Sequence, residues 1–180
     1  MARSFYYPQS GALMHHYQEG DFLDHQIARC PDPTLSAADL AIMTVFAMPR
    51  WVMVLLGVRN MLVRPFGLKT GDEHGFAPPT REDIMSGRYE GMFAVEYVSD
   101  EEVTFGTDDW HVDFRVSVLR TRNPANHVAV STWVHPHNLF GRMYLFLVYP
   151  FHKLIVWRML SNLKDTPQKV RQGHVSHTKG

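Results

Sequence analysis

The longest apolar stretch of the chain, residues 138–163, predicts a single long helix. It contains no cluster of turn-forming residues, and its leucine, methionine and aromatic residues recur at helical spacing. At 1.5 Å per residue, it would be roughly 39 Å long. Asn138 suits the N-cap, and Pro150 should bend the helix because it removes a backbone hydrogen bond. Apolar residues occur on nearly all sides, which is typical of a helix that is buried, lies in a membrane or lines a hydrophobic cavity.

A strand and two helices are expected earlier in the chain. Residues 21–30 are short and apolar enough for a first strand, which a proline-containing turn ends. Ser36 and Asp39 have the spacing of a capping box, and a helix is predicted over residues 37–47. A second helix is predicted over residues 50–64, with one broad apolar face that includes Trp51.

From residue 92 onward the hydrophobic period changes to two, which predicts a series of antiparallel strands. The predicted strands are residues 92–98, 101–106, 109–120 and 127–137, joined by polar turns. The alternation is clearest in the third, where one face has Trp110, Val112, Phe114, Val116 and Val118 and the other has His111, Asp113, Arg115 and Ser117. An antiparallel sheet with one face covered by the long helix makes an α+β, two-layer domain.

The segments outside these elements are polar or rich in turn formers. Residues 67–91 contain five glycines and two prolines without the spacing of a phosphate-binding loop, and a loop of this length is a candidate lid. Residues 1–20 are expected to be a loosely ordered arm and residues 164–180 a disordered polar tail. The chain is therefore predicted to form one domain over residues 21–163.

Composition narrows the function classes. Among 180 residues there are 18 Lys or Arg and 18 Asp or Glu, so no net charge attracts nucleic acid. The one cysteine, Cys30, forms neither a disulfide framework nor a cysteine zinc site and favours a reducing, cytoplasmic setting. The N-terminal region has no continuous apolar run of the kind found in secretory signals. No cofactor is predicted, and the oligomeric state is left open.

Residues 139–160 are long enough to span a bilayer, but their composition argues against it. The segment contains Arg142, Lys153 and Arg158, and each charge near the bilayer centre costs roughly 2.5–3.5 kcal/mol of insertion free energy. A transmembrane span is therefore not expected. Peripheral membrane contact, through this helix or the one that contains Trp51, is compatible with the pattern.

Three motifs carry a family resemblance. They are VRNMLVRPFGLK around Arg59 and Asn60, DDWHVDFRVSV over residues 108–118, and HNLFGRMYLFLVYPFHKLIV over residues 137–156. Together they resemble domain-of-unknown-function family 2867, over most of residues 21–163. The resemblance implies a START-like, or helix-grip, fold, in which an antiparallel sheet wraps a long C-terminal helix and leaves an apolar cavity. It implies no reaction, and this chain is expected to have fewer strands than is typical of that superfamily.

Two predicted strands place histidine and acidic residues on one face. If their hairpin is regular, Asp113 lies opposite His135 and His111 opposite His137, with Arg115 beside them. Such neighbours are about 4.5–5.5 Å apart at Cβ, close enough for an imidazole–carboxylate hydrogen bond or a metal site. A solvated strand face, a buried structural network and acid–base chemistry also fit this pattern, and no metal site is predicted.

Polar side chains of the predicted helices form a second group. Arg142, Tyr144, Tyr149 and His152 lie in the long helix, and Arg59 and Asn60 lie in the second helix. They are either the polar edge of ordinary packing or groups that point into a cavity and orient a ligand.

The leading hypothesis is a cavity between the sheet and the C-terminal helix that binds a small hydrophobic or amphipathic ligand. The predicted ligand-binding residues are Arg59, His111, Asp113, Arg115, His137, Arg142, Tyr149 and His152. One alternative is an enzyme that uses Asp113 with His135 or His137 as an acid–base pair in the same cavity. Another is a peripheral membrane or partner-docking protein.

Overall fold

One five-stranded antiparallel sheet forms the centre of the fold. The computed structural model describes residues 11–30, 32–67, 78–91, 93–122 and 125–163. The strand order is β1-β5-β4-β3-β2. The strands are β1 (Phe22–Arg29), β2 (Ala94–Val98), β3 (Glu102–Asp108), β4 (Val112–Thr121) and β5 (His127–Pro136). The predicted meander is therefore confirmed, and the N-terminal strand joins it beside β5.

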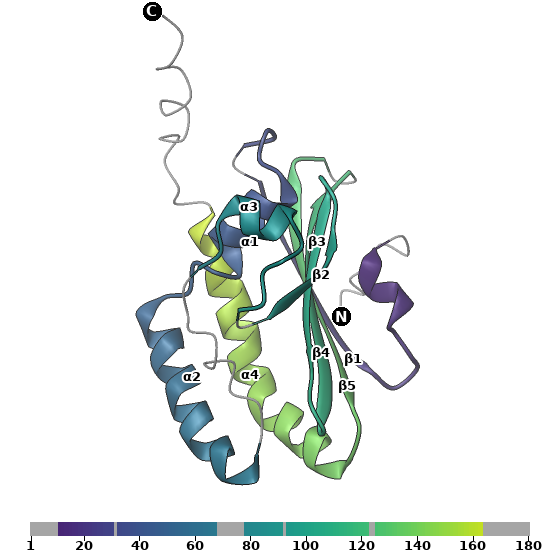
Figure 1. The fold of residues 1–180 in the computed structure, drawn as a ribbon, viewed down its shortest axis with the longest axis vertical. Helices are drawn as coiled ribbons and strands as arrows, with labels where there is room; N and C mark the ends of the chain where they lie inside the picture. The colour runs from purple at the N-terminus through teal and green to yellow at the C-terminus, as the bar shows by residue number, and fades with distance from the viewer. Residues whose placement is uncertain (1–10, 31, 68–77, 92, 123–124, 164–180) are drawn as a thin grey trace, which may run out of the picture.

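In the described part of the chain, the α-helices lie on one face of the sheet and a short 3-10 helix lies on the other (Figure 1). The α-helices are α1 (Ala37–Thr44), α2 (Arg50–Val63), α3 (Arg81–Met85) and α4 (Leu139–Asn162). The 3-10 helices are η1 (Ala12–His15), on the opposite face, and η2 (Arg64–Phe66), which extends α2. The arrangement is the predicted α+β, helix-grip type, with the long C-terminal helix packed along the sheet.

Helix ends follow the local sequence signals. Ser36 and Asp39 form a reciprocal capping box at α1, and the Asn138 side chain accepts a hydrogen bond of 2.9 Å from the backbone N–H of Gly141. α4 continues through Pro150 as one helix. α3 was not predicted, because it lies inside the glycine- and proline-rich stretch of residues 67–91. Residues 68–77 of that predicted lid lie outside the described part of the chain.

The main core lies between the sheet, α1 and the C-terminal end of α4. The inner strand residues are valines and one phenylalanine, which the period of two brings to one face. The core includes Ala37, Leu40 and Ala41 of α1, Val103, Phe105, Val116, Val118, Val128 and Val130 of the strands, and Val156, Leu160 and Leu163 from α4 and its C-cap. α1 and the last turns of α4 are thereby fixed to the sheet by buried apolar contact.

The other face of the sheet is covered in part by η1. Leu13 is fully buried and packs against Trp133. The backbone N–H of Ala12 donates a hydrogen bond of 3.0 Å to the buried carboxylate of Glu102, which also accepts one of 2.5 Å from the Ser117 hydroxyl. Residues 11–16 of the expected loose arm therefore pack against the sheet, whereas residues 17–20 are exposed. Residues 1–10 and the predicted tail, residues 164–180, lie outside the described part of the chain.

The first turn of α4 approaches the start of β4 through Gly141. A Cβ atom at this position would lie 2.1 Å from the carbonyl oxygen of His111, which is closer than any real contact. Only glycine lets the helix and the strand backbone come this close. Gly57 of α2 is a contrasting helical glycine, because a Cβ atom there would meet no atom within 4 Å.

We predict that Gly141→Ala destabilises the fold by about 1–3 kcal/mol, because the added methyl group forces the helix away from the strand. The intrinsic helix propensity of alanine, about 1 kcal/mol better than that of glycine, acts in the opposite direction. The matched control is Gly57→Ala, which should raise the free energy of unfolding by about 0.5–1 kcal/mol. Urea unfolding measures both, and equal effects of the two substitutions would contradict the packing argument.

Candidate functional site

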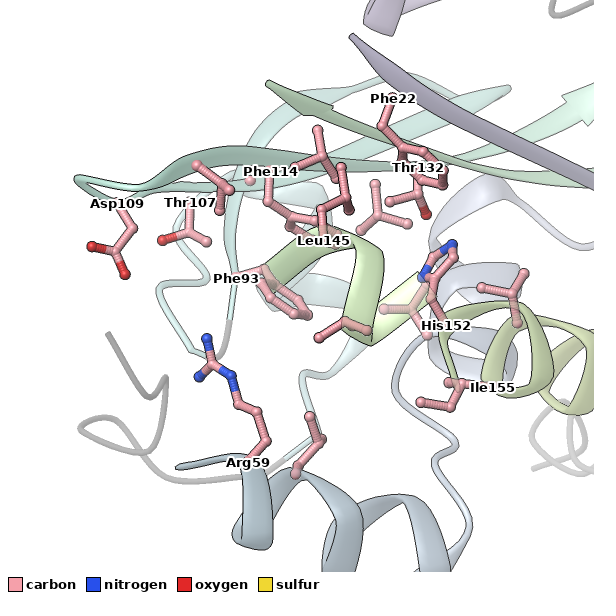
Figure 2. A pocket seen from close by; sticks show the side chains of 18 of the residues that line it. Phe22, Arg59, Phe93, Thr107, Asp109, Phe114, Thr132, Leu145, His152 and Ile155 are labelled. Carbon is pink, nitrogen blue, oxygen red and sulfur yellow. The ribbon is translucent and has the colours of Figure 1, made fainter. Parts of the chain in front are cut away.

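A cavity of about 690 Å³ lies among α2, α4 and the inner face of the sheet. Figure 2 shows the lining side chains, with Phe114 and Thr132 projecting from the strands, Leu145 and His152 from α4, and Arg59 from α2. Most of the lining is apolar. The apolar residues include Phe22, Val45, Met48, Val52, Leu56, Phe93, Val112, Val116, Val130, Val134, Val148, Ile155, Val156 and Met159.

The position of α4 explains why the space exists. Near its N-terminus the helix is close to the sheet at Gly141, and near its C-terminus Val156 and Leu160 are buried in the core. Between these points, Leu145 and Val148 are only half-buried and line the cavity. The strand residues that line the cavity, such as Val130, are too short to fill the gap.

One end of the cavity has a polar cluster, made by Arg59, Tyr144, His111 and Asp109. The Arg59 Nε atom donates a hydrogen bond of 3.0 Å to the Tyr144 hydroxyl, and the Tyr144 ring meets the His111 ring edge to face with centroids 5.1 Å apart. His111 Nδ1 lies 3.5 Å from a carboxylate oxygen of Asp109. A second guanidinium nitrogen of Arg59 donates to the Asn60 side chain at 3.0 Å. The cluster thus joins α2, α4 and the turn between β3 and β4.

His111 is the most buried member of the cluster, with 1% of its surface exposed. Among the described residues neither ring nitrogen has a hydrogen-bond partner, because the 3.5 Å contact with Asp109 lacks hydrogen-bond geometry. Burial lowers the pKa of His111 below its ordinary 6.5, and the opposing effect of Asp109 is smaller. His111 is therefore neutral at pH 7 and can donate or accept a proton inside the cavity.

A second polar contact involves His152, which lines the cavity. His152 Nε2 is 3.3 Å from a carboxylate oxygen of Asp24, on the first strand. Burial raises the pKa of Asp24, but the His152 contact and a hydrogen bond from Gln26 outweigh it, so the pKa lies below its ordinary value. Tyr149 lies beside this pair, edge to face with Phe22 at 5.1 Å. This contact connects α4 to the edge of the sheet.

The structure divides the predicted ligand-binding residues into two groups. Arg59, His111, Tyr149 and His152 line the cavity. Asp113, Arg115, His137 and Arg142 are not among the lining residues. Arg142 is exposed on α4, and the other three belong to the part of the sheet that faces away from the helix.

The predicted hairpin register is confirmed, but the prediction of the sheet face on which His111 lies is not. Asp113 lies opposite His135, as expected. The Asp113 carboxylate is hydrogen-bonded to His137 at 2.9 Å, whereas His135 contacts Asp21 at 2.6 Å. The prediction that His111 shares this face is wrong: His111 precedes the first residue of β4 and lies in a turn, where the strand alternation does not apply, and its ring lines the cavity.

Arg115 has a structural environment on the outer face. Its guanidinium group is within 2.5 Å of carboxylate oxygens of both Glu96 and Asp108, and it lies 5.9 Å from the centre of the Trp133 ring. Both acids interact with it across neighbouring strands. These ion pairs fasten β2 and β3 to β4 beneath η1, so Arg115 belongs to the sheet's outer layer.

Sequence reasoning did not select Asp109 or Asp24, and it considered Asn60 and Tyr144 as polar helix residues without including them among the predicted ligand-binding residues. Asp109 was assigned to a strand, although an Asp-Asp pair before Trp110 is also a turn signal that could have placed it beside His111. Asp24 has no such signal, because it approaches His152 only through tertiary packing. Within the described ranges, no three His, Cys, Asp or Glu side chains are arranged to bind a metal ion.

We predict that neutral, buried His111 makes stability fall in mild acid. In the unfolded chain its pKa is near 6.5, and in the fold it is lower, so protonation favours unfolding. The contribution of His111 to the free energy of unfolding is complete above about pH 6.5 and decreases as the pH falls through that value. The variant His111→Phe should reduce the slope of unfolding free energy against pH, measured between about pH 7.5 and about pH 5.5, by up to about 1.4 kcal/mol per pH unit.

The control for this experiment is Val112→Ala in the same wall of the cavity. It should lower stability at every pH and leave the slope as in the wild type, because no titrating group is lost. Burial also lowers the pKa of His25, so part of the slope should persist in His111→Phe. The slope should decrease again in the double variant His111→Phe/His25→Asn. A wild-type slope in His111→Phe and in the double variant would contradict the assignment.

Comparisons with known proteins place the chain in a family by sequence. The family model described as "Protein of unknown function (DUF2867)" matches residues 16–159. The comparison with curated proteins and the comparison with solved structures each found no match. The matched region contains the whole sheet, the cavity and the polar cluster around His111. Because the match covers well over half of its length, the chain belongs to the DUF2867 family.

Proposed function

We propose that this protein is a START-like domain that binds a small hydrophobic or amphipathic molecule between α2, α4 and the sheet. The observation that carries the proposal is the cavity itself, with a volume of about 690 Å³ and a largely apolar lining. Cavities for small molecules commonly have volumes of about 300–1,000 Å³ and a few polar groups that fix orientation. The helix-grip arrangement, in which the long helix stands off the sheet, supports the START-like assignment.

The distribution of lining residues indicates how a ligand would lie. Its apolar part would contact the strand valines and the half-buried residues of α4, such as Leu145 and Val148. A polar group of the ligand would lie at the end formed by Arg59 and His111. There, the Arg59 guanidinium group and a neutral imidazole both line the cavity. This supports an amphipathic ligand with a single polar end.

The test is native mass spectrometry of the purified protein, together with binding of a fluorescent apolar probe, anilinonaphthalene sulfonate. We predict that Leu145→Trp lowers probe affinity by at least about tenfold, because the larger side chain occupies space in the cavity. The matched control is Leu147→Trp, two residues along the same helix, where the side chain is exposed and points away from the cavity. Equal affinities of the two variants, or no bound molecule and no probe binding, would overturn the proposal.

A second candidate function is acid–base catalysis in the same cavity, with His111 in place of the predicted His135 or His137. The observation that favours it is the buried imidazole of His111 beside Asp109, at the cavity wall. Its lowered pKa leaves a neutral base at pH 7 in a position to accept a proton from a bound molecule. Arg59 would stabilise negative charge that develops on the same molecule.

We predict that, if this second function is correct, a molecule recovered from the cavity is chemically changed on incubation with fresh protein, and that His111→Gln lowers the rate by about 10²–10⁴-fold. The control is His137→Gln, on the outer face and hydrogen-bonded to Asp113, which should leave the rate unchanged. Mass spectrometry follows the conversion. A recovered molecule that stays unchanged would leave ligand binding as the function and remove the catalytic one.

A further inference from the structure

The sides of α2 and α4 that face away from the cavity are apolar and exposed. On α4 the outer stripe consists of Leu139, Met143, Phe146, Leu147, Leu154 and Trp157. Phe146 has 86% of its surface exposed and Leu139 has 72%. On α2 the outer stripe consists of Trp51, Val54, Val58 and Met61. Single exposed apolar side chains are ordinary on soluble proteins, but two continuous stripes indicate a contact surface.

The charged residues of α2 and α4 are all positive. At roughly 100° per residue, Arg142 and Lys153 lie along one edge of the α4 outer stripe and Arg158 along the other. Arg50 and Arg64 lie at the two ends of α2, and all five side chains are exposed. Neither helix contains an Asp or a Glu. Exposed aromatic and aliphatic residues with a cationic border are typical of helices that lie in the interface of an anionic membrane.

We propose that the outer stripes of α2 and α4 dock the protein onto the surface of a membrane with anionic headgroups. Phe146 and Trp157 insert among the acyl chains near the headgroups, and the bordering arginines and lysine contact the anionic lipids. For a cytoplasmic protein, the anionic inner leaflet supplies such a surface. This inference concerns the outer side of the helices and does not depend on what the cavity binds.

Two other occupants fit the same surface less well. A second copy of the chain would bring the cationic borders of two α4 helices together with no acidic residue on either helix to pair with them. A transmembrane orientation fits α4 by length and composition over Leu139–Ser161. However, its other side packs on the sheet and carries His152, which contacts Asp24, so spanning would require the helix to leave the fold.

The experiment is vesicle flotation with the full chain and two kinds of vesicle, phosphatidylcholine alone and phosphatidylcholine with phosphatidylserine. The wild type should bind the vesicles that contain phosphatidylserine, and binding should weaken as salt is added. The double variant Phe146→Ser/Trp157→Ser should bind at least about tenfold more weakly. Arg142→Gln and Lys153→Gln should each lower binding about fivefold.

Matched controls come from exposed residues on or next to the strands, away from α2 and α4. Tyr97→Ser on β2 removes an exposed aromatic side chain, and Arg122→Gln removes an exposed positive charge near the end of β4. Both should bind vesicles as the wild type does. If they weaken binding as much as the stripe variants do, the outer stripes are not the docking surface.

Three further results would overturn the proposal. The first is an absence of binding to either vesicle. The second is a wild-type protein that sediments as a dimer and does not bind vesicles, together with a Phe146→Ser/Trp157→Ser variant that sediments as a monomer. This result would assign the surface to a second copy of the chain. The third is protein that stays in cell membranes after an alkaline carbonate wash, which would assign α4 as a span.

Discussion

The fold depends on how α4 is attached to the sheet at its two ends. At the N-terminal end, Gly141 brings the helix against the carbonyl group of His111, and at the other end Val156, Leu160 and Leu163 are buried with the strand valines. Because α4 is rigid and is attached at both ends, its middle stays at a distance from the sheet that the strand side chains do not fill. The cavity is thus a consequence of where the helix is anchored. Its polar end forms at the first anchor, because the turn that accepts Gly141 also supplies His111.

The unusual hydrophobicity of α4 follows from three different neighbours. One side contacts the core, a second lines the cavity with Leu145 and Val148, and a third is exposed with Phe146 and Leu147. Such a helix has apolar residues on nearly every side, although not every side is buried. α2 repeats the pattern on a smaller scale, since Val52 and Leu56 line the cavity while Val54 and Met61 are exposed.

Much of the fold could be predicted because its signals are local. Alternation from Val112 to Pro136 determined two strands and their register, and Asn138 marked the start of α4. The site was less predictable because it depends on where turns end and on distant contacts. One turn extends through Asp109 to His111 and moves that imidazole to the other side of the sheet. His135 pairs with Asp21, which precedes the first strand, so Asp113 pairs with His137, the other histidine predicted as its partner. No local pattern specifies either outcome.

The contact between η1 and the outer face bears on where the folding unit begins. The family match extends from residue 16 to residue 159, yet Leu13, Leu160 and Leu163 are buried beyond its limits. A shortened protein that started at the matched region would uncover Trp133 and remove one hydrogen-bond donor from the buried carboxylate of Glu102. The buried carboxylate would then have fewer donors, which favours its protonation or the entry of water between β3 and β4. The cooperative unit is therefore longer than the segment that sequence similarity delimits.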